Sequence, residues 1–135
     1  MKIIHILNSL KGGGIQNFIL SLAPEQKKLG CDVSIIVVDR DTYEYSKHLK
    51  DILVNNGVKV YYLNKILHNK ISFIKTLINC RKLVQSLRPD IINSHGEMSH
   101  IYVAFSTIGR KKINHYITIH NGPENWSNIN KILNR

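Results

Sequence analysis

The sequence has few cysteines and no long apolar run, and each absence excludes a class of protein. Cys31 and Cys80 are far apart and fall in no CxxC or Cys/His spacing, which excludes a disulfide framework and a cysteine-based metal site. No apolar segment is long enough to span a bilayer. The apolar run after Met1-Lys2 is too short for a signal peptide. We therefore expect a cytoplasmic protein with reduced thiols.

Acidic residues are also scarce. The chain of 135 residues has 9 of them against 19 lysines and arginines, a formal net charge of +10. Such a charge fits nucleic acid, anionic lipid or phosphorylated substrates as partners. The basic residues are spread along the chain without the aromatic interleaving of a single-strand binder, so we expect no nucleic-acid partner. Hydrophobic residues make up 43%, which is typical of a folded globular domain.

Three consecutive glycines, Gly12, Gly13 and Gly14, lie between two different hydrophobic patterns. Residues 2–7 are almost continuously apolar, which is typical of a buried parallel strand. From residue 15 onward the apolar residues recur at helical spacing. Glycine lets a ligand approach the bare N–H groups of a helix N-terminus, where an anion is favoured. Two interpretations stay open: a bound phosphate or other polar ligand, or a tight turn that only requires glycine.

The rest of the sequence continues this alternation of strand and helix patterns. Further strands are predicted over residues 33–38, 58–63, 90–93 and 115–119, with helices up to residue 28 and over residues 43–55, 71–87, 97–108 and 125–135. Pro24 predicts a kink or an early end of the first helix, because its ring crowds the carbonyl of Leu20. The predicted fold class is α/β, a Rossmann-like parallel sheet of order 3-2-1-4-5 flanked by helices.

The helix expected over residues 71–87 combines an apolar side with a basic one. We expect the buried side to consist of Ile71, Ile74, Leu77, Ile78, Val84 and Leu87. The other side carries Lys75, Arg81 and Lys82. A basic amphipathic helix of this kind either rests on anionic lipid or presents a solvated face. Peripheral contact with the inner face of a membrane is therefore one expectation, and a solvated surface is its alternative.

In an open sheet of this order, ligands bind beyond the carboxyl ends of the strands, where the strand order reverses. The loops that border this crevice are residues 9–14 and 94–96, with residues 120–123 one strand further along. His95 and His120 lie in these loops, where they can orient a polar substrate or transfer a proton, or serve only as structural histidines. We interpret His5, inside a strand, as a core or sheet-face residue. No metal-ligand spacing links the histidines, so we predict no metal site.

Three stretches of the sequence resemble the family 4 glycosyltransferases. They are residues 12–23 continuing through Leu29-Gly30-Cys31-Asp32-Val33, residues 88–96 and residues 117–122. The resemblance implies a GT-B architecture, in which two Rossmann-like domains face each other across a cleft. Residues 1–135 would be the N-terminal, acceptor-side domain, incomplete at its C-terminus. The donor-binding domain or subunit would be absent, so the isolated chain is expected to be inactive.

The resemblance also implies roles for particular residues. His120 would be catalytic, contacting the donor sugar near the reacting centre. The substrate-binding residues would be Gly12, Gly13, Gly14, Gln16, His95, Gly96, Asn121 and Gly122. The implied reaction moves a sugar, with retention, from a nucleotide-sugar co-substrate to a glycan or lipid-linked acceptor, as in polysaccharide biosynthesis. It needs no bound metal, and this domain alone would hold no cofactor.

A second hypothesis belongs to another class of protein. The chain would then be a stand-alone Rossmann-type nucleotide-binding or regulatory module. Asp39, at the end of the second strand, would hydrogen-bond to a ribose hydroxyl. The fingerprint G-x-G-x-x-G argues against it, because it requires glycine at the position of Asn17.

Overall fold

A computed structural model describes residues 1–109 and 113–120 of the chain. Its five strands are parallel and form one sheet of order β3-β2-β1-β4-β5, which confirms the predicted fold class. The strands are β1 (Lys2–Leu7), β2 (Asp32–Asp39), β3 (Lys59–Lys65), β4 (Ile91–His95) and β5 (Asn114–Thr118). The helices are α1 (Gly14–Lys28), α2 (Glu44–Asn55), α3 (Lys70–Leu87) and α4 (Glu97–Thr107). The helix predicted over residues 125–135 lies outside the described residues.

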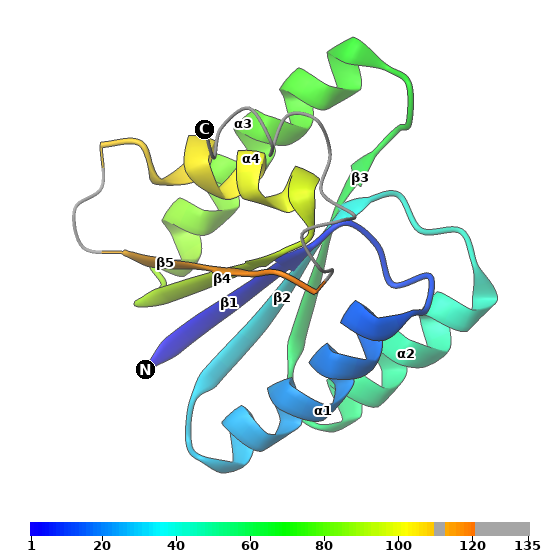
Figure 1. Cartoon of the computed structure of the whole chain (residues 1–135), viewed down its shortest axis with the longest axis vertical. Helices are drawn as coiled ribbons and strands as arrows, with labels where there is room; N and C mark the ends of the chain where they lie inside the picture. Colours follow the sequence, from blue (N-terminus) through cyan, green and yellow to red (C-terminus); the bar gives the residue numbers. More distant parts are fainter. Residues whose placement is uncertain (110–112, 121–135) are drawn as a thin grey trace.

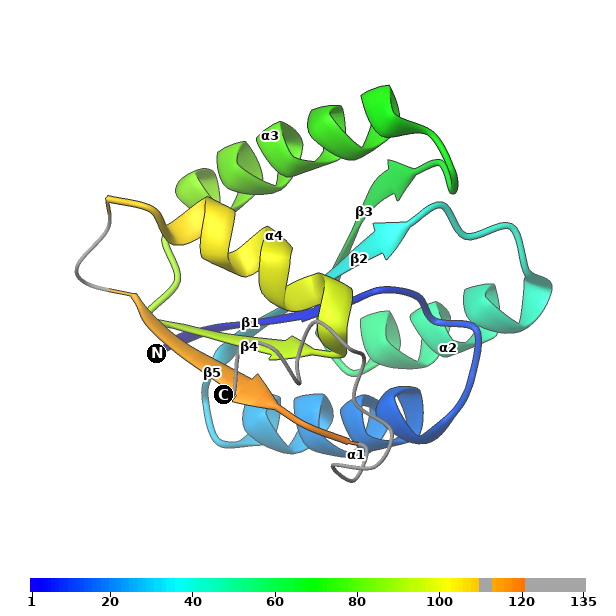
Figure 2. The same ribbon diagram turned by 45° about the horizontal axis from the view of Figure 1, so that its top comes forward.

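The helices cover the two faces of the sheet in pairs, α1 with α2 and α3 with α4 (Figures 1 and 2). Successive side chains of a strand point to opposite faces, so β1 and β2 contribute to two separate cores. Ile4 and Ile36 belong to the core under α3 and α4, whereas Leu7 and Ile35 belong to the core under α1 and α2. The same alternation places His5 on the α1 face.

Helix α1 continues through Pro24 to Lys28, so the predicted early end is wrong, while the kink stays a prediction. A proline inside a helix costs about 3 kcal/mol through its missing N–H and its steric clash. Ile19 and Ala23 are fully buried on the same helix, and their packing against the sheet offsets that cost.

Helix α3 buries only part of the side that was predicted: Leu77, Val84 and Leu87 pack against the core as expected. Ile71, Ile74 and Ile78 are 80%, 58% and 44% exposed, which corrects their predicted place in the core. The buried residues are Thr76, Cys80 and Val84, with Phe73, Leu77, Leu83 and Leu87 partly buried beside them. The reason is α4, which packs along α3 on the same face of the sheet and selects which side of the helix is covered (Figure 2).

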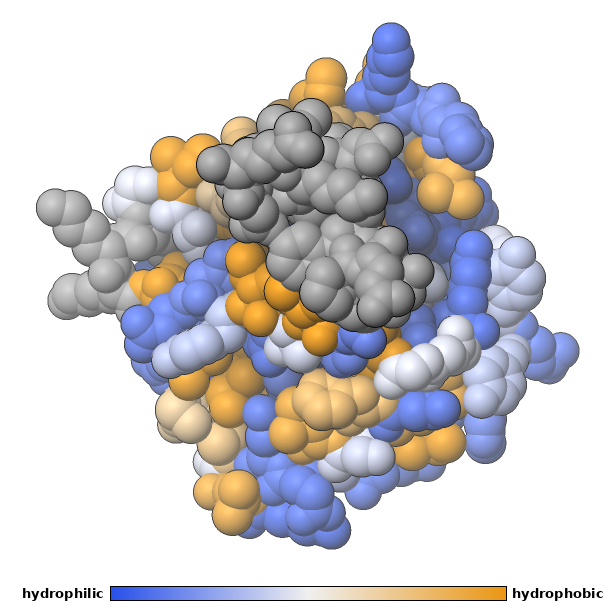
Figure 3. Space-filling model, in the orientation of Figure 1, coloured by the Kyte–Doolittle hydropathy of each residue, from blue (hydrophilic) through white to orange (hydrophobic). Residues whose placement is uncertain are grey.

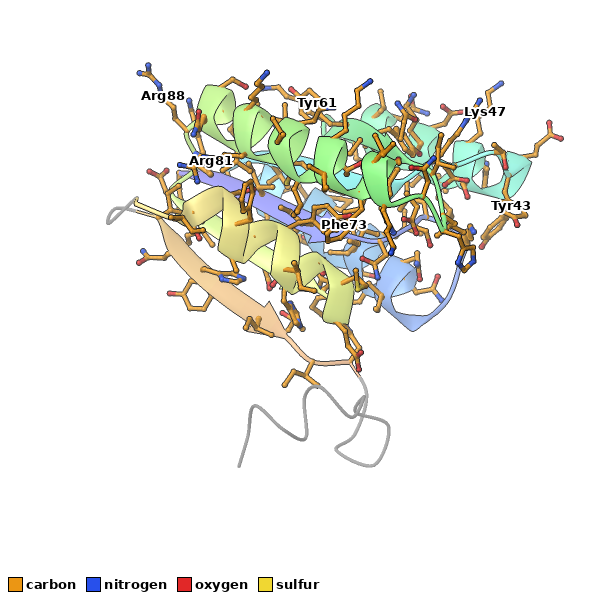
Figure 4. The ribbon with its side chains drawn as sticks, turned by 90° about the horizontal axis from the view of Figure 1, so that it is seen from above. Tyr43, Lys47, Tyr61, Phe73, Arg81 and Arg88 are labelled. Carbon is orange, nitrogen blue, oxygen red and sulfur yellow. The ribbon has the colours of Figure 1, made fainter. Side chains whose placement is uncertain are left out.

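Arg81 also lies elsewhere than predicted, between α3 and α4 (Figure 4). Its guanidinium donates to the carbonyl oxygens of Phe105 at 2.9 Å and Ile108 at 3.2 Å, at the C-terminal end of α4. The last carbonyls of a helix have no intrahelical donor, and a cation is favoured there. Arg81 therefore ties the two helices together, and Lys75 and Lys82 remain exposed on α3.

Candidate functional site

The loops predicted to meet at the strand reversal do lie together. We call this edge the carboxyl rim, meaning the ends of β1, β4 and β5 with the residues that follow them. Leu7 pairs with His95, and His95 pairs with Thr118, so the three strands end level with one another. A Cβ added to Gly96 would lie 3.8 Å from Nδ2 of Asn8, which brings the first loop against the end of β4.

Asn8 leaves an acceptor unused at this rim. Its Oδ1 is buried and has no hydrogen-bond partner among the residues that the structure describes. Buried polar atoms are normally paired, because an unpaired one costs free energy. The oxygen has almost no accessible surface, so a ligand could reach it only if neighbouring side chains moved.

Two glycines cap the helices on either side of the reversal. Gly13 precedes α1 with φ 136° and ψ −173°, and Gly96 precedes α4 with φ 86° and ψ 155°. This backbone region is essentially restricted to glycine. Within the described residues no side chain caps either helix, so no side chain occupies their first N–H groups. The conformation accommodates both interpretations of the glycine loop, a ligand site and a tight turn.

Gln16 holds the glycine loop in shape. Its side-chain amide donates to the carbonyl oxygen of Ser9 at 2.7 Å. Ser46 of α2 donates to the carbonyl oxygen of Leu10 at 3.0 Å, which fastens the loop from the other side. The loop is therefore preformed, and a role of Gln16 in binding substrate stays a prediction.

Three histidines form a continuous hydrogen-bonded row that begins beneath the rim at His5, passes through His95 and ends at the rim with His120. We call this row the histidine relay. Nδ1 of His5 lies 3.0 Å from Nε2 of His95, and Nδ1 of His95 lies 2.9 Å from Nε2 of His120. At the inner end, Nε2 of His5 lies 2.8 Å from Oε1 of Gln26 in α1. Phe18 packs edge-on against the ring of His120. The relay thus connects helix α1 to the end of β5 across the sheet.

Burial keeps the relay uncharged. His5 and His95 are each 1% exposed. Desolvation lowers the pKa of His5, although its hydrogen bond with Gln26 acts in the opposite direction. Desolvation, with smaller contributions from repulsion by the neighbouring histidines, lowers the pKa of His95 to about 3. Burial also lowers the pKa of His120. The three imidazoles are therefore neutral near physiological pH.

Two further histidines meet at a buried serine. Oγ of Ser94 lies 2.7 Å from Nδ1 of His100 and 2.8 Å from Nε2 of His115. Desolvation lowers the pKa of both histidines. Ser94 lies in β4, His100 in α4 and His115 in β5, so the sequence alone could not pair the two histidines with this serine. Among residues 1–109 and 113–120 no group of three His, Cys, Asp or Glu side chains is placed to hold a metal ion.

The structure places most of the predicted site residues on the carboxyl rim or directly beneath it. Those at the rim are Gly12, Gly13, Gly14, Gln16, Gly96 and His120, while Asn121 and Gly122 lie outside the described residues. His95 is the last residue of β4 and not part of a loop, so its ring is buried below His120. Sequence reasoning missed His5 and Gln26 as partners of this site. The available signal was a histidine in the middle of an otherwise apolar strand.

Asp39 does not have the free carboxylate that the dinucleotide hypothesis requires. Its Oδ1 lies 3.3 Å from Nζ of Lys65, and the two side chains are only 16% and 14% exposed. Lys65 ends β3 and Asp39 ends β2, so the ion pair joins neighbouring strands. This observation weakens the nucleotide-binding alternative.

The sequence matches Glycosyltransferase Family 4 over residues 12–135. The chain belongs to this family. The match confirms the resemblance drawn from the glycine loop and the ends of the fourth and fifth strands, and it makes the chain a glycosyltransferase-type domain. No curated protein matches the sequence.

Solved structures share the fold at low sequence identity. The chain is similar to a glycosyltransferase from Rickettsia africae ESF-5, with TM-score 0.74 and 17% identity, covering 98% of this chain and 32% of that one. It is similar to MurG from Acinetobacter baumannii, with TM-score 0.64 and 15% identity, covering 90% of this chain and 36% of that one. The chain thus spans about a third of the length of these structures.

The fold by itself does not separate the two hypotheses. A leucoanthocyanidin reductase from Vitis vinifera, solved with NADPH, matches with TM-score 0.58 and 13% identity, covering 84% of this chain and 34% of that one. Rossmann-like sheets serve many chemistries, so function must be argued from the site and the family.

Proposed function

We propose that this chain is the acceptor-side portion of an enzyme that moves a sugar, with retention, from a nucleotide-sugar donor to a glycan or lipid-linked acceptor. The observation that carries the proposal is the carboxyl rim, where the loop after β1, Gly96 and His120 all lie on one edge of the sheet. Ligands of open α/β sheets bind at this edge. Membership of Glycosyltransferase Family 4 supports the reaction class.

In this proposal different residues of the rim contact different parts of the substrates. His120 contacts the donor sugar, and the uncapped N–H groups after Gly13 face the donor phosphates or the acceptor. Asn121 and Gly122, which follow His120 in the sequence, are the remaining substrate-binding residues of this proposal. The nucleotide-sugar is a co-substrate, and the basic groups that meet the charge of the leaving nucleotide come from the donor-binding half.

The edge of the sheet supports the proposal that further structure packs here. β5 is the last strand of the sheet, and Tyr116, Ile117 and Ile119 are 56%, 54% and 56% exposed. An exposed apolar edge strand invites pairing, and folded proteins normally cover it. Elsewhere the described apolar side chains occur in small groups among hydrophilic ones on the face seen in Figure 3. We propose that the rest of the enzyme, in the same chain or in a partner subunit, covers β5.

Complementation tests this function. The chain is joined to, or co-expressed with, the donor-binding domain of a family 4 glycosyltransferase, and transfer of a labelled sugar from nucleotide-sugars is measured. We expect transfer only when both halves are present, because neither half alone closes the cleft. Tight binding of NAD by the chain in calorimetry, together with no transfer in any combination, would establish the nucleotide-binding alternative instead.

The exposed side of α3 supports a peripheral contact with the inner, anionic face of the cytoplasmic membrane. Ile71, Ile78, Lys75 and Lys82 recur along one exposed stripe of the helix. The helix contains no acidic residue. Basic amphipathic helices lie with their apolar side chains at the headgroup boundary and their lysines against anionic lipid. In the part of the chain that the structure describes, no helix has the length and apolar character needed to cross a bilayer.

Vesicle sedimentation tests this contact. We expect the chain to bind vesicles of phosphatidylglycerol and phosphatidylcholine, and to bind pure phosphatidylcholine far more weakly. The double variant Lys75→Ala/Lys82→Ala should bind about thirtyfold more weakly, since each lysine near the surface contributes about 1 kcal/mol. Lys47→Ala, on the exposed side of α2, is the matched control and should bind like the wild type. Equal binding to both kinds of vesicle would rule out the charged stripe as the cause.

A further inference from the structure

The hydrogen bonds of the histidine relay all donate in the same direction along the row. Gln26, at the inner end of the row, sets that direction. Oε1 of Gln26 is a carbonyl oxygen and can only accept a hydrogen bond, so Nε2 of His5 must carry the proton. A neutral imidazole has one N–H, so Nδ1 of His5 accepts from Nε2 of His95. By the same rule, Nδ1 of His95 accepts from Nε2 of His120. Every ring of the relay is then protonated on Nε2.

We propose that Gln26, His5 and His95 are positioning residues that hold His120 as its Nε2–H tautomer, with Nδ1 presented at the rim as a hydrogen-bond acceptor for a sugar hydroxyl. Among the described residues no group hydrogen-bonds to Nδ1 of His120. The sugar hydroxyl rests on the function proposed above. The tautomer is a property of this chain alone.

The surroundings of the relay favour one fixed arrangement. Successive imidazoles are tilted by 36° with ring centroids 5.2 Å apart, and Phe18 lies 5.3 Å from the centroid of His120. The groups that contact the rings include the amide of Gln26 and the ring of Phe18, both from α1. His100 of α4 opposes protonation of His95 only when His100 is itself protonated. No carboxylate hydrogen-bonds to a relay ring within the described residues. The amide of Gln26 is therefore the group that breaks the symmetry between the two possible directions.

The consequence for recognition is specific. A neutral His120 that already donates to His95 has no second N–H for its ligand. It can only accept, so the partner must be a donor such as a hydroxyl. This arrangement selects a hydroxyl-bearing position of the sugar and disfavours a carbonyl or carboxylate oxygen there, because two acceptors would face each other without a proton.

Nuclear magnetic resonance tests the proposal on the chain itself. In a long-range proton–nitrogen correlation spectrum of isotope-labelled histidine near neutral pH, we expect His5, His95 and His120 each to be protonated on Nε2 and bare on Nδ1. Gln26→Leu removes the terminal acceptor, and His120 should then lose its single tautomer and gain a population protonated on Nδ1. Gln26→Glu keeps an acceptor oxygen and should retain the wild-type pattern at His120. Gln85→Leu on α3 is the matched control and should leave all three rings unchanged.

Each result decides the proposal. Protonation of His120 on Nδ1 in the wild type would mean that the relay runs in the opposite direction, and the proposal would be overturned. If His120 keeps its wild-type tautomer in Gln26→Leu, Gln26 does not set that tautomer. If Gln26→Leu does not fold, the wild type and Gln26→Glu still decide the direction. The tautomers are measured without any sugar transfer, so a failed complementation experiment would not contradict the proposed relay. Equally, a relay that runs in the opposite direction would not contradict the proposed function.

Discussion

Replacing His120 with alanine is expected to lower the rate of sugar transfer about a hundredfold in the complex with a donor-binding half, a typical loss for one polar catalytic contact. The ring stands at the end of the relay on the carboxyl rim. In the proposed function, its removal takes away the acceptor that His120 offers to the sugar. We expect the main effect on kcat, with a smaller change in the KM for the nucleotide-sugar, because the proposed contact is made near the reacting centre.

The measurement is steady-state transfer of labelled sugar by wild type and variant at equal folded concentration. His48→Ala is the control, since His48 is exposed on α2 away from the relay. His120 is itself partly exposed, so its truncation leaves a gap that water can enter, and the variant should stay folded. Undiminished transfer by His120→Ala would remove this residue from the mechanism.

Acidification is expected to weaken the folded state by about 2 kcal/mol between pH 7 and pH 5 through His95 alone. His95 has a pKa of about 3 in the folded chain, against an ordinary value of 6.5. Below pH 6.5, His95 therefore binds a proton in the unfolded chain but stays unprotonated in the folded chain until the pH approaches 3. Stability is fully present above pH 6.5 and is lost progressively as the pH falls towards 3. Burial lowers the pKa of His5 as well, so His5 acts in the same direction.

Urea unfolding at a series of pH values checks this prediction. In the wild type, the free energy of unfolding should fall steadily as the pH drops below 6.5, with an unchanged dependence on urea concentration. His95→Gln is less stable at neutral pH because it breaks the relay, but its stability should fall by about 1.4 kcal/mol less per pH unit, the contribution of one proton. Identical slopes in the two proteins would show that His95 does not resist protonation.

Local patterns in the sequence determined the architecture of this protein. Strands buried on both faces appear as nearly unbroken apolar runs, as in Ile35 to Val38, and the alternation with helical spacing requires a parallel sheet with crossovers. The glycine loop could be placed at a helix N-terminus because an apolar strand pattern precedes it and apolar residues at helical spacing follow it. The structure adds that Gly13 adopts a backbone conformation essentially restricted to glycine. The residues at strand ends could be grouped on one rim because parallel strands end on the same side of the sheet.

The tertiary structure alone decided which side chains meet. His5 and His95 are 90 positions apart, and nothing local to either predicts that their rings share a hydrogen bond beneath His120. The side of α3 that is buried was decided by α4, a helix whose contact no spacing within α3 encodes. The ion pair of Asp39 with Lys65 likewise depends on how the neighbouring strands β2 and β3 pair. Helical and strand periods are local properties of the chain, whereas pairing between distant residues depends on how the elements pack.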